Sequence, residues 1–284
     1  MRPLSLILVL LFGLRSFAQN EFDQYGPFGA AVYTDLKDVG GLENQVYKLD
    51  LNYKVLDNKA LSRIQNLNNL QVLRMRNNGI NRYPDNMEKL QNLVYFASYN
   101  NAFTSFLPKP ESYRSLHYIE LQHCKIDSIP ASIAYLRLLT TFKFGNTDDS
   151  LKLPSSLQYL KKLKSLSFEN CILDSMPKQL FRIQGLQFLS LSNTGTKYLS
   201  SHFERLPELE VLIVENNPLT SLPFDIYKAQ KLRIISLRSD KISKIPDSIS
   251  QLENLSILDL RGNPIEADEV EKLRALLPGC EIKF

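Results

Sequence analysis

Several residue types are scarce in this sequence of 284 residues, and each shortage excludes a class of protein. Tryptophan is absent, and there are only three cysteines and three histidines. An odd number of cysteines leaves at least one thiol unpaired, which excludes a small domain built on a disulfide framework. No metal-ligand spacing, glycine-rich phosphate loop or nucleophile–base pair occurs along the chain. We therefore expect no catalysis, no cofactor and no metal site.

A strong net charge is also missing. The 34 basic and 30 acidic residues leave +4, which falls to +2 without Arg2 and Arg15. A protein that binds nucleic acid normally presents a basic face, so a nucleic-acid partner is not expected. The nearest basic cluster is formed by Lys161, Lys162 and Lys164. It is short and is interpreted as the solvated edge of a repeat.

Long apolar runs are missing except at the start of the chain. Residues 3–14 are apolar, follow Arg2 and precede the small-x-small sequence Ser-Phe-Ala at 16–18. This order is typical of a cleavable secretory signal, and the run is too short for a membrane span of about 20 residues. No cysteine follows it that could carry a lipid. We expect residues 1–18 to be removed, leaving a secreted or periplasmic chain from about Gln19 with no stable membrane insertion.

What the sequence has in abundance is a repeat of 23 or 24 residues with the pattern L-x-x-L-x-L-x-x-N-x-L. The ten repeats begin at Val46, Leu70, Leu93, Leu116, Leu139, Leu163, Leu186, Leu209, Leu232 and Leu255. Near-equal intervals of this length predict a solenoid, in which each repeat buries its apolar face against its neighbours. The repeats span residues 46–265.

Each repeat begins with a predicted strand. Positions four and six are apolar and point inward, as at Leu73 and Met75, so the strands should stack in one parallel sheet. Position nine should turn inward and bond to backbone groups that the strand leaves unpaired. Its residues are Lys54, Asn78, Asn101, Cys124, Thr147, Cys171, Thr194, Asn217, Asp240 and Asn263. Lys54 is too long for this role, which indicates that the first repeat is partly a cap.

The second half of each repeat reads L-P-x-x-I-x-x-L. Proline followed by apolar residues three apart predicts one or two helical turns on the convex side. Residues 103–115 carry both Pro108 and Pro110, so we expect this segment to be extended. The stretch 147–153 has an extra residue and is interpreted as a solvated loop. Its two acids, Asp148 and Asp149, are too few for a calcium site.

Both ends carry cap signals. In residues 19–45, Thr34 and Asp35 can cap a short helix that stops at Gly40 and Gly41. In residues 266–284, the apolar stripe of 267–277 predicts a helix, and alternation from Cys280 predicts a closing strand. Solenoids need such caps, so we expect no effector domain to follow.

The cysteines are expected to be reduced. Cys124 and Cys171 share one motif position two repeats apart, which places their Cα atoms roughly 10 Å from each other. A disulfide needs less than about 7 Å. We therefore expect three free thiols, including Cys280, that are mostly buried.

These repeats resemble those of the leucine-rich repeat superfamily over nearly the whole chain that follows residue 18. The L-P-x-x-I-x-x-L half resembles the Ras-suppressor type, and the absence of disulfide-bonded caps together with a signal segment favours an exported bacterial protein. The resemblance implies an α/β fold: a right-handed horseshoe solenoid with a parallel concave sheet and short helices or extended turns outside. It also implies that the concave sheet binds other proteins.

Positions three, five and seven should point out of the concave face. Near the N-terminal end they include a cluster rich in Tyr and Arg, the residue types most enriched in binding hot spots. The predicted binding residues are Arg74, Arg76, Tyr95, Tyr99, Tyr118, Glu120 and Gln122. They lie on adjacent strands about 4.8 Å apart, so their side chains should touch.

The rest of the predicted concave face is plainer. Its middle carries Lys143, Gly145, Ser165, Ser167, Ser190 and Ser192, and a mixed patch follows at Ile213, Glu215, Arg238, Asp259 and Arg261. Strand propensity alone explains position three at Val72, Phe188, Val211, Ile234 and Ile257. For the tyrosines at position three, strand propensity is the alternative to a role in binding.

The histidines do not form a catalytic or metal site. His117, Glu120 and His123 share one predicted strand, where steps of three residues span roughly 10 Å and alternate between faces. His202 belongs to the convex side of another repeat.

The primary hypothesis is an exported, non-catalytic module that binds a protein or peptide through its concave face. The alternatives are an envelope scaffold or glycan-binding protein, whose tyrosines would stack on sugars, and a structural solenoid that assembles through its edges. The sequence leaves the oligomeric state open.

Overall fold

The computed structural model describes residues 24–145, 150–173 and 175–284. Within them, twelve parallel strands form one sheet, and each strand is hydrogen-bonded to the next along the chain. The strands are β1 (Val32–Tyr33), β2 (Lys48–Asp50), β3 (Val72–Arg76), β4 (Tyr95–Tyr99), β5 (Tyr118–Gln122), β6 (Thr141–Gly145), β7 (Ser165–Glu169), β8 (Phe188–Ser192), β9 (Val211–Ile213), β10 (Ile234–Ser236), β11 (Ile257–Asp259) and β12 (Glu281–Lys283). Three sequence predictions lie outside the described residues: the signal segment 1–18, Thr147 at position nine and the acids Asp148 and Asp149.

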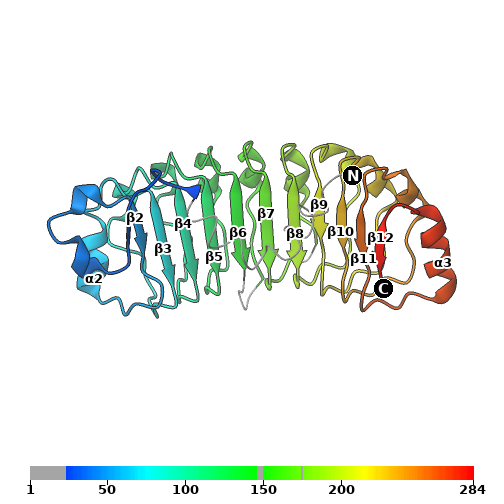
Figure 1. Ribbon diagram of the computed structural model, residues 1–284, viewed down its shortest axis with the longest axis horizontal. Helices are drawn as coiled ribbons and strands as arrows, with labels where there is room; N and C mark the ends of the chain where they lie inside the picture. Colours follow the sequence, from blue (N-terminus) through cyan, green and yellow to red (C-terminus); the bar gives the residue numbers. More distant parts are fainter. Residues whose placement is uncertain (1–23, 146–149, 174) are drawn as a thin grey trace.

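The helical segments lie between consecutive strands. Two α-helices lie wholly within the described residues, α2 (Asn58–Ile64) and α3 (Ala267–Leu276). The others are 3-10 turns: η1 (Leu36–Val39), η2 (Glu43–Gln45), η3 (Met87–Lys89), η4 (Pro110–Ser112), η5 (Ala131–Tyr135), η6 (Ser155–Tyr159), η7 (Lys178–Arg182), η8 (Phe203–Arg205), η9 (Phe224–Lys228) and η10 (Asp247–Gln251). Figure 1 shows the strands side by side along the long axis of the molecule in chain order. The predicted horseshoe solenoid is confirmed.

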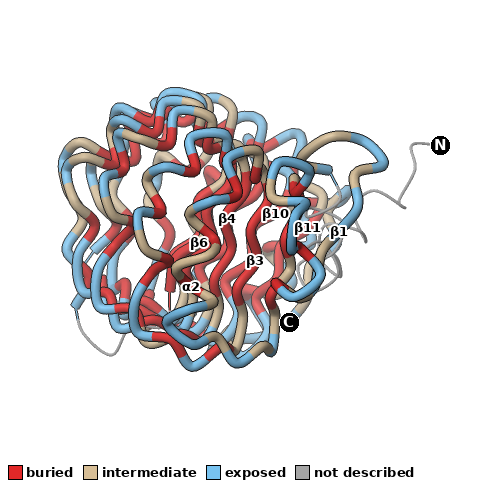
Figure 2. The backbone as a smooth tube through the Cα atoms, turned by 90° about the vertical axis from the view of Figure 1, so that its left-hand side faces the viewer, coloured by how far each residue is buried: buried red, intermediate tan, exposed pale blue. Residues whose placement is uncertain are grey.

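The core runs through the inside of the coils. Leu73 and Met75 of β3 are completely buried, as are the matching pairs Ile119/Leu121 and Leu212/Val214. In the end-on view of Figure 2, buried residues line the strands and the inside of each coil, and exposed residues gather on the outer turns. The inward orientation of positions four and six is therefore confirmed.

The polar residues at position nine bond to the backbone of neighbouring repeats. The amide of Asn101 donates to the carbonyl of Met75 at 2.9 Å, and its oxygen accepts from the backbone N–H groups of Asn78 at 3.2 Å and Ile80 at 3.4 Å. Asn217 repeats this arrangement five repeats later, where its amide donates to the carbonyl of Leu191. These side chains provide hydrogen-bond partners for buried backbone groups that are not paired within the sheet. The role predicted for position nine is confirmed for Asn78, Asn101, Thr194, Asn217, Asp240 and Asn263.

The convex segments correct one prediction. They are short 3-10 turns, and in the repeats with an L-P sequence the proline stands immediately before the turn, as Pro130 does before η5. Residues 103–115 were expected to be extended because of their two prolines, yet η4 begins at Pro110. Proline lacks an N–H, but the first residues of a helical turn have no acceptor for one. Pro110 stands at the start of η4, where a proline is tolerated, and so it does not prevent the turn.

Both predicted end structures are present. In η1, the carboxylate of Asp35 accepts from the N–H of Lys37 at 2.9 Å, and Leu36 and Val39 are buried. At the other end, α3 buries Leu273, and β12 pairs in parallel with β11. Edge coils are thereby covered at both ends of the described chain.

The three cysteines are free thiols, as the strand spacing predicts. Burial raises the pKa of Cys124 and of Cys171 to about 12, so both stay protonated near neutral pH. Across the described residues, no helix is long and apolar enough to cross a membrane.

Candidate functional site

The predicted binding residues come together on the concave face because three neighbouring strands pair in register. Tyr95 lies opposite Tyr118, and Tyr99 lies opposite Arg76 on one side and Gln122 on the other. The rings of Tyr95 and Tyr118 are stacked, with centroids 4.3 Å apart and planes at 11°. Side chains in register on adjacent strands were expected to touch, and they do.

The N-terminal segment covers part of this cluster. The ring of Tyr25 packs against Tyr95, with centroids 5.4 Å apart, and against Tyr118 at 6.1 Å. Gly26 follows with a φ of +79°, and a methyl group there would lie 3.1 Å from Lys48 Cε and 3.2 Å from Cγ2 of Val72. The backbone at Gly26 thus lies directly on the sheet, which explains why glycine occupies this position.

This cover changes the interpretation of two predicted contact residues. Tyr95 and Tyr118 have no exposed surface, and they form an apolar cluster with Val72 and Ala97 that is separate from the main core. Sequence reasoning placed both tyrosines at an open concave surface. The residues that cover them lie about 70 to 90 positions earlier in the chain, outside any repeat pattern. A partner therefore reaches these rings only after Tyr25 moves aside.

Charged residues of the cluster are held in ion pairs. Glu120 accepts a hydrogen bond from the hydroxyl of Tyr118 at 2.9 Å and pairs with Arg76, whose Nη2 lies 3.2 Å from its Oε2. Arg74 Nη1 lies 3.2 Å from Oδ2 of Asp50. Glu120 and Arg74 are nearly buried, and a buried charge is tolerated only with such a partner. These two residues orient their neighbours and expose little surface of their own.

The accessible part of the cluster is its rim at position seven. Arg76, Tyr99 and Gln122 are each partly exposed and stand side by side on β3, β4 and β5. The Tyr99 ring meets the His123 ring edge-on at 4.4 Å, and the Arg76 guanidinium lies 5.9 Å from the Tyr99 centroid. We call these three residues the concave rim. Glu120 and His123 restrict Arg76 and Tyr99 before any partner arrives.

The second half of the concave face holds a feature that sequence reasoning missed. Its apolar side chains form a cluster separate from the main core: Phe188, Val211, Ile213, Ile234 and Ile257. Four of them were attributed to strand propensity. The sequence does contain a signal for this cluster: apolar residues recur at positions three and five of consecutive repeats, and these positions stack on one face of the sheet. The serines of β7 and β8 separate this cluster from the tyrosines.

The mixed patch lies on the same strands, β9 to β11, or just after them, and several of its polar side chains are held in pairs. Arg261 pairs with Asp259, with its Nε 2.9 Å from Oδ1, and Ser236 donates to Glu215. Arg238 is exposed at the same edge.

The histidines do not converge. His117 lies before β5 with its Nδ1 2.7 Å from the carbonyl of Ser115, and His123 lies after β5 against Tyr99. Among the described residues, no group of three or more His, Cys, Asp or Glu side chains is placed to hold a metal ion.

Comparison with known proteins supports the same architecture. Residues 207–265 match the family model for leucine-rich repeats. The fold of the chain is that of a leucine-rich repeat solenoid. Comparison with curated protein sequences found no significant match to it.

Two solved structures are similar to this chain. The crystal structure of PEPR1–AtPEP1 superposes with a TM-score of 0.62 at 20% identity, covering 81% of this chain and 34% of that one. A leucine-rich repeat protein of Leptospira interrogans is 23% identical and covers 89% of this chain and 100% of its own, with a TM-score of 0.40. This chain thus spans about a third of the PEPR1 chain, and that likeness concerns the fold alone.

Proposed function

We propose that this protein is an exported, non-catalytic module that recognises a protein or peptide through the concave face of its sheet. Leucine-rich repeat folds commonly mediate protein binding, and PEPR1, which shares the fold, was crystallised with AtPEP1. The signal-like residues 1–18 favour export to the periplasm or the medium.

The concave rim is the observation that carries this proposal. Tyr and Arg are the commonest hot-spot residues, and here they stand on consecutive strands of a continuous sheet. Glu120 holds Arg76, and His123 packs on Tyr99. Little side-chain freedom is lost when a partner binds such residues, so more of the contact energy remains as affinity.

Tyr25 determines how deep a partner can reach. The rim is open while Tyr25 lies on Tyr95 and Tyr118. A partner that packs an apolar side chain on Tyr95 and Tyr118 must displace Tyr25, and that displacement lowers its apparent affinity. The rim is therefore the first contact, and the tyrosine pair is a second one under the control of Tyr25.

The test is affinity capture from envelope and secreted fractions of the source cell. The protein recovered from those fractions should begin near Gln19 by mass spectrometry. The rim variant Arg76→Ala/Tyr99→Ala/Gln122→Ala should lose the captured partner, with Kd raised about tenfold or more. Tyr25→Ala should retain that partner at least as tightly as the unaltered protein.

Tyr198→Ala is the matched control, because Tyr198 is 68% exposed and lies outside the concave face. Circular dichroism of all variants checks the fold. A partner held equally by the rim variant and the unaltered protein contradicts recognition through the rim. Recovery of the uncut chain inside the cell alone contradicts export.

A further inference from the structure

A second surface lies along the lateral edge of the solenoid, at the last residue of each 3-10 turn. In most repeats this position is polar: Lys89, Ser112, Arg182, Arg205, Lys228 and Gln251. In two consecutive repeats it is tyrosine, at the ends of η5 and η6. Tyr135 is 56% exposed and Tyr159 is 57% exposed. Two adjacent aromatic rings are thus left in water at a position that other repeats fill with polar side chains.

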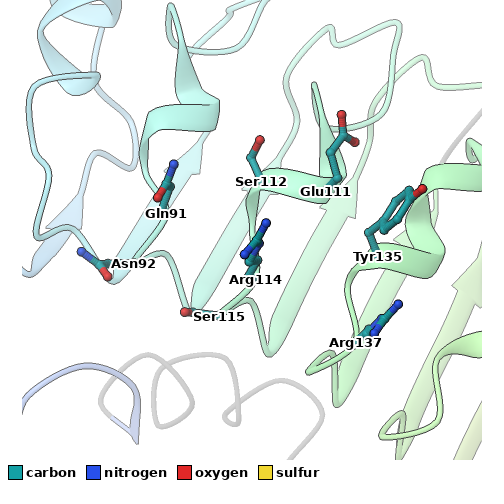
Figure 3. Close-up of a pocket in the computed structure, with 8 residues that line it drawn as sticks. All are labelled: Gln91, Asn92, Glu111, Ser112, Arg114, Ser115, Tyr135 and Arg137. Carbon is teal, nitrogen blue, oxygen red and sulfur yellow. The ribbon is translucent and has the colours of Figure 1, made fainter.

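Tyr135 separates two hollows on this edge. One, of about 530 Å³, is lined by Tyr135, Arg137, Tyr159, Lys161 and Lys162 together with Ala134. The other, of about 880 Å³, extends from Tyr135 and Arg137 across the two preceding repeats. Figure 3 shows Arg114 and Glu111 on the repeat next to Tyr135, and Gln91 and Asn92 on the repeat beyond. The two hollows follow the amino ends of strands β4 to β7.

The positive charges on this edge are not compensated. Arg114, Arg137, Lys161 and Lys162 are exposed, and among the described residues none has an acidic oxygen within 4.0 Å. Lys161 instead donates to the carbonyl of Arg182 at 3.2 Å. Three repeats further on, Lys231 lies 2.6 Å from Glu208. The cations beside the tyrosines are therefore available to an anion, whereas Lys231 has an internal partner.

We propose that this lateral tyrosine–basic surface, formed by Arg114, Tyr135, Arg137, Tyr159, Lys161 and Lys162, binds an acidic polysaccharide. The C–H faces of a sugar ring are apolar and pack on an exposed aromatic ring by dispersion and water release. Carboxylate or sulfate groups on the sugar pair with the arginines and lysines. The polymer would lie along the edge and cross successive repeats.

The uncharged lining of the larger hollow favours a sugar over other anionic polymers. Gln91, Ser112 and Ser115 offer amide and hydroxyl groups that can exchange hydrogen bonds with the hydroxyls of a sugar. A nucleic acid would be favoured by a longer basic groove that tracks many phosphates. Among the described residues that line the two hollows, four cations have no acidic partner, and Glu111 adds a negative charge beside them. This surface is separate from the concave rim and does not depend on the function proposed for it.

The test is binding of a labelled polygalacturonate oligosaccharide, measured by fluorescence anisotropy at low and physiological salt. The unaltered protein should bind it, and neutral dextran should not compete. Tyr135→Ala/Tyr159→Ala and Arg137→Ala/Lys161→Ala should each weaken binding about tenfold or more. Tyr135→Phe/Tyr159→Phe should retain binding, because the stacking face of the ring is unchanged.

Two control variants distinguish binding at this surface from nonspecific binding to exposed tyrosines or positive charges elsewhere on the protein. Tyr198→Ala removes an exposed tyrosine elsewhere, and Lys231→Ala removes a cation that has a partner, so both should bind as the unaltered protein does. Binding that the tyrosine variant retains in full overturns the proposal. Equal or tighter binding of polyglutamate or of single-stranded oligothymidylate also overturns it, because charge or base stacking would then suffice.

Discussion

Asp240 is a position-nine residue whose side chain is only partly satisfied by hydrogen bonds. Its Oδ1 accepts from the backbone N–H of Asn217 at 2.6 Å, but its Oδ2 has no hydrogen-bond partner among the described residues. Burial raises the pKa of Asp240 from 3.8 to about 8. An asparagine here could also donate to a backbone carbonyl, as Asn217 donates to Leu191 at 2.8 Å.

We predict that Asp240→Asn stabilises the protein, and that the gain grows with pH. A carboxyl whose pKa is higher in the folded state than in the unfolded state costs stability as pH rises from about 4 to about 8, because the unfolded chain ionises first. The amide does not ionise. Urea unfolding at pH 8 should show a gain of about 1–3 kcal/mol, the usual cost of an unsatisfied buried polar group.

The matched control is Asp127→Asn, because Asp127 is exposed. It should leave stability unchanged at both ends of this pH range. Equal unfolding midpoints for Asp240→Asn and the unaltered protein at pH 8 would contradict the prediction.

Residues at position eight of the repeats share a backbone conformation that the sequence pattern does not reveal. This position has positive φ in every repeat described there, and its residues are Tyr53, Asn77, Asn100, His123, Asn170, Asn193, Asn216, Ser239 and Gly262. Asparagine and glycine adopt this region readily, whereas tyrosine, histidine and serine adopt it less often. The varied residue types hide the shared conformation, which the bend after each strand imposes.

At the scale of the element, the β6–β7 pair depends on a close approach. A methyl group at Gly145, the last residue of β6, would lie 2.0 Å from the carbonyl oxygen of Glu169 and 2.8 Å from its carbonyl carbon. Both are backbone atoms, so no side-chain rotation relieves the clash. Glycine here permits the strands to pair in register up to their last residues.

We predict that Gly145→Ala lowers the free energy of unfolding by about 1–3 kcal/mol, because the added methyl forces the two strands apart. Chemical denaturation measures the change. Gly185→Ala is the control, since its methyl would lie 3.7 Å from the nearest atom, the carbonyl oxygen of Lys161. A Gly145→Ala variant as stable as Gly185→Ala would show that β6 and β7 have room to separate.

At the scale of the whole molecule, stability is a sum of contacts between neighbouring coils, so the ends need covers. The C-terminal cover combines β12, which pairs with β11, and α3, which buries Leu273. Glu269 of α3 accepts from the backbone N–H of Ile245 at 2.9 Å and pairs with Lys272 at 2.7 Å. The cap is therefore joined to the last coils by both apolar and polar contacts.

We predict that deleting residues 266–284 makes the protein associate or aggregate, because β11 becomes an open edge strand above uncovered apolar side chains. Light scattering after gel filtration measures the association. Hydrogen exchange should show lost protection in β10 and β11 and retained protection in β3 to β5. The control variant Glu271→Ala/Arg274→Ala changes exposed residues of α3. It should show the same association state and the same hydrogen exchange as the unaltered protein. A monomeric deletion variant with unchanged exchange would contradict a capping role.

Much of the fold was predictable because the repeat is local. Spacing alone places Leu73 and Met75 inside, Asn101 on the backbone and Arg76 beside Tyr99. The convex turns were less predictable, because a single 3-10 turn requires so little of its residues that even Pro110 can begin one. The residues of the predicted contact cluster lie together as expected. The burial of its two central tyrosines was not predicted, because neither Tyr25 nor Gly26, which cover them, belongs to a repeat.

The sequence by itself determined the solenoid, the parallel order of its strands and the set of residues on the concave face, since each follows from a fixed period. Tertiary structure alone decided that Tyr95 and Tyr118 lie beneath Tyr25, that the concave rim remains open, and that Tyr135 and Tyr159 stand in water beside uncompensated cations. The physical reason is that a period specifies contacts between neighbouring coils. Exposure depends also on segments outside the period, and charge compensation depends on which acids fold nearby.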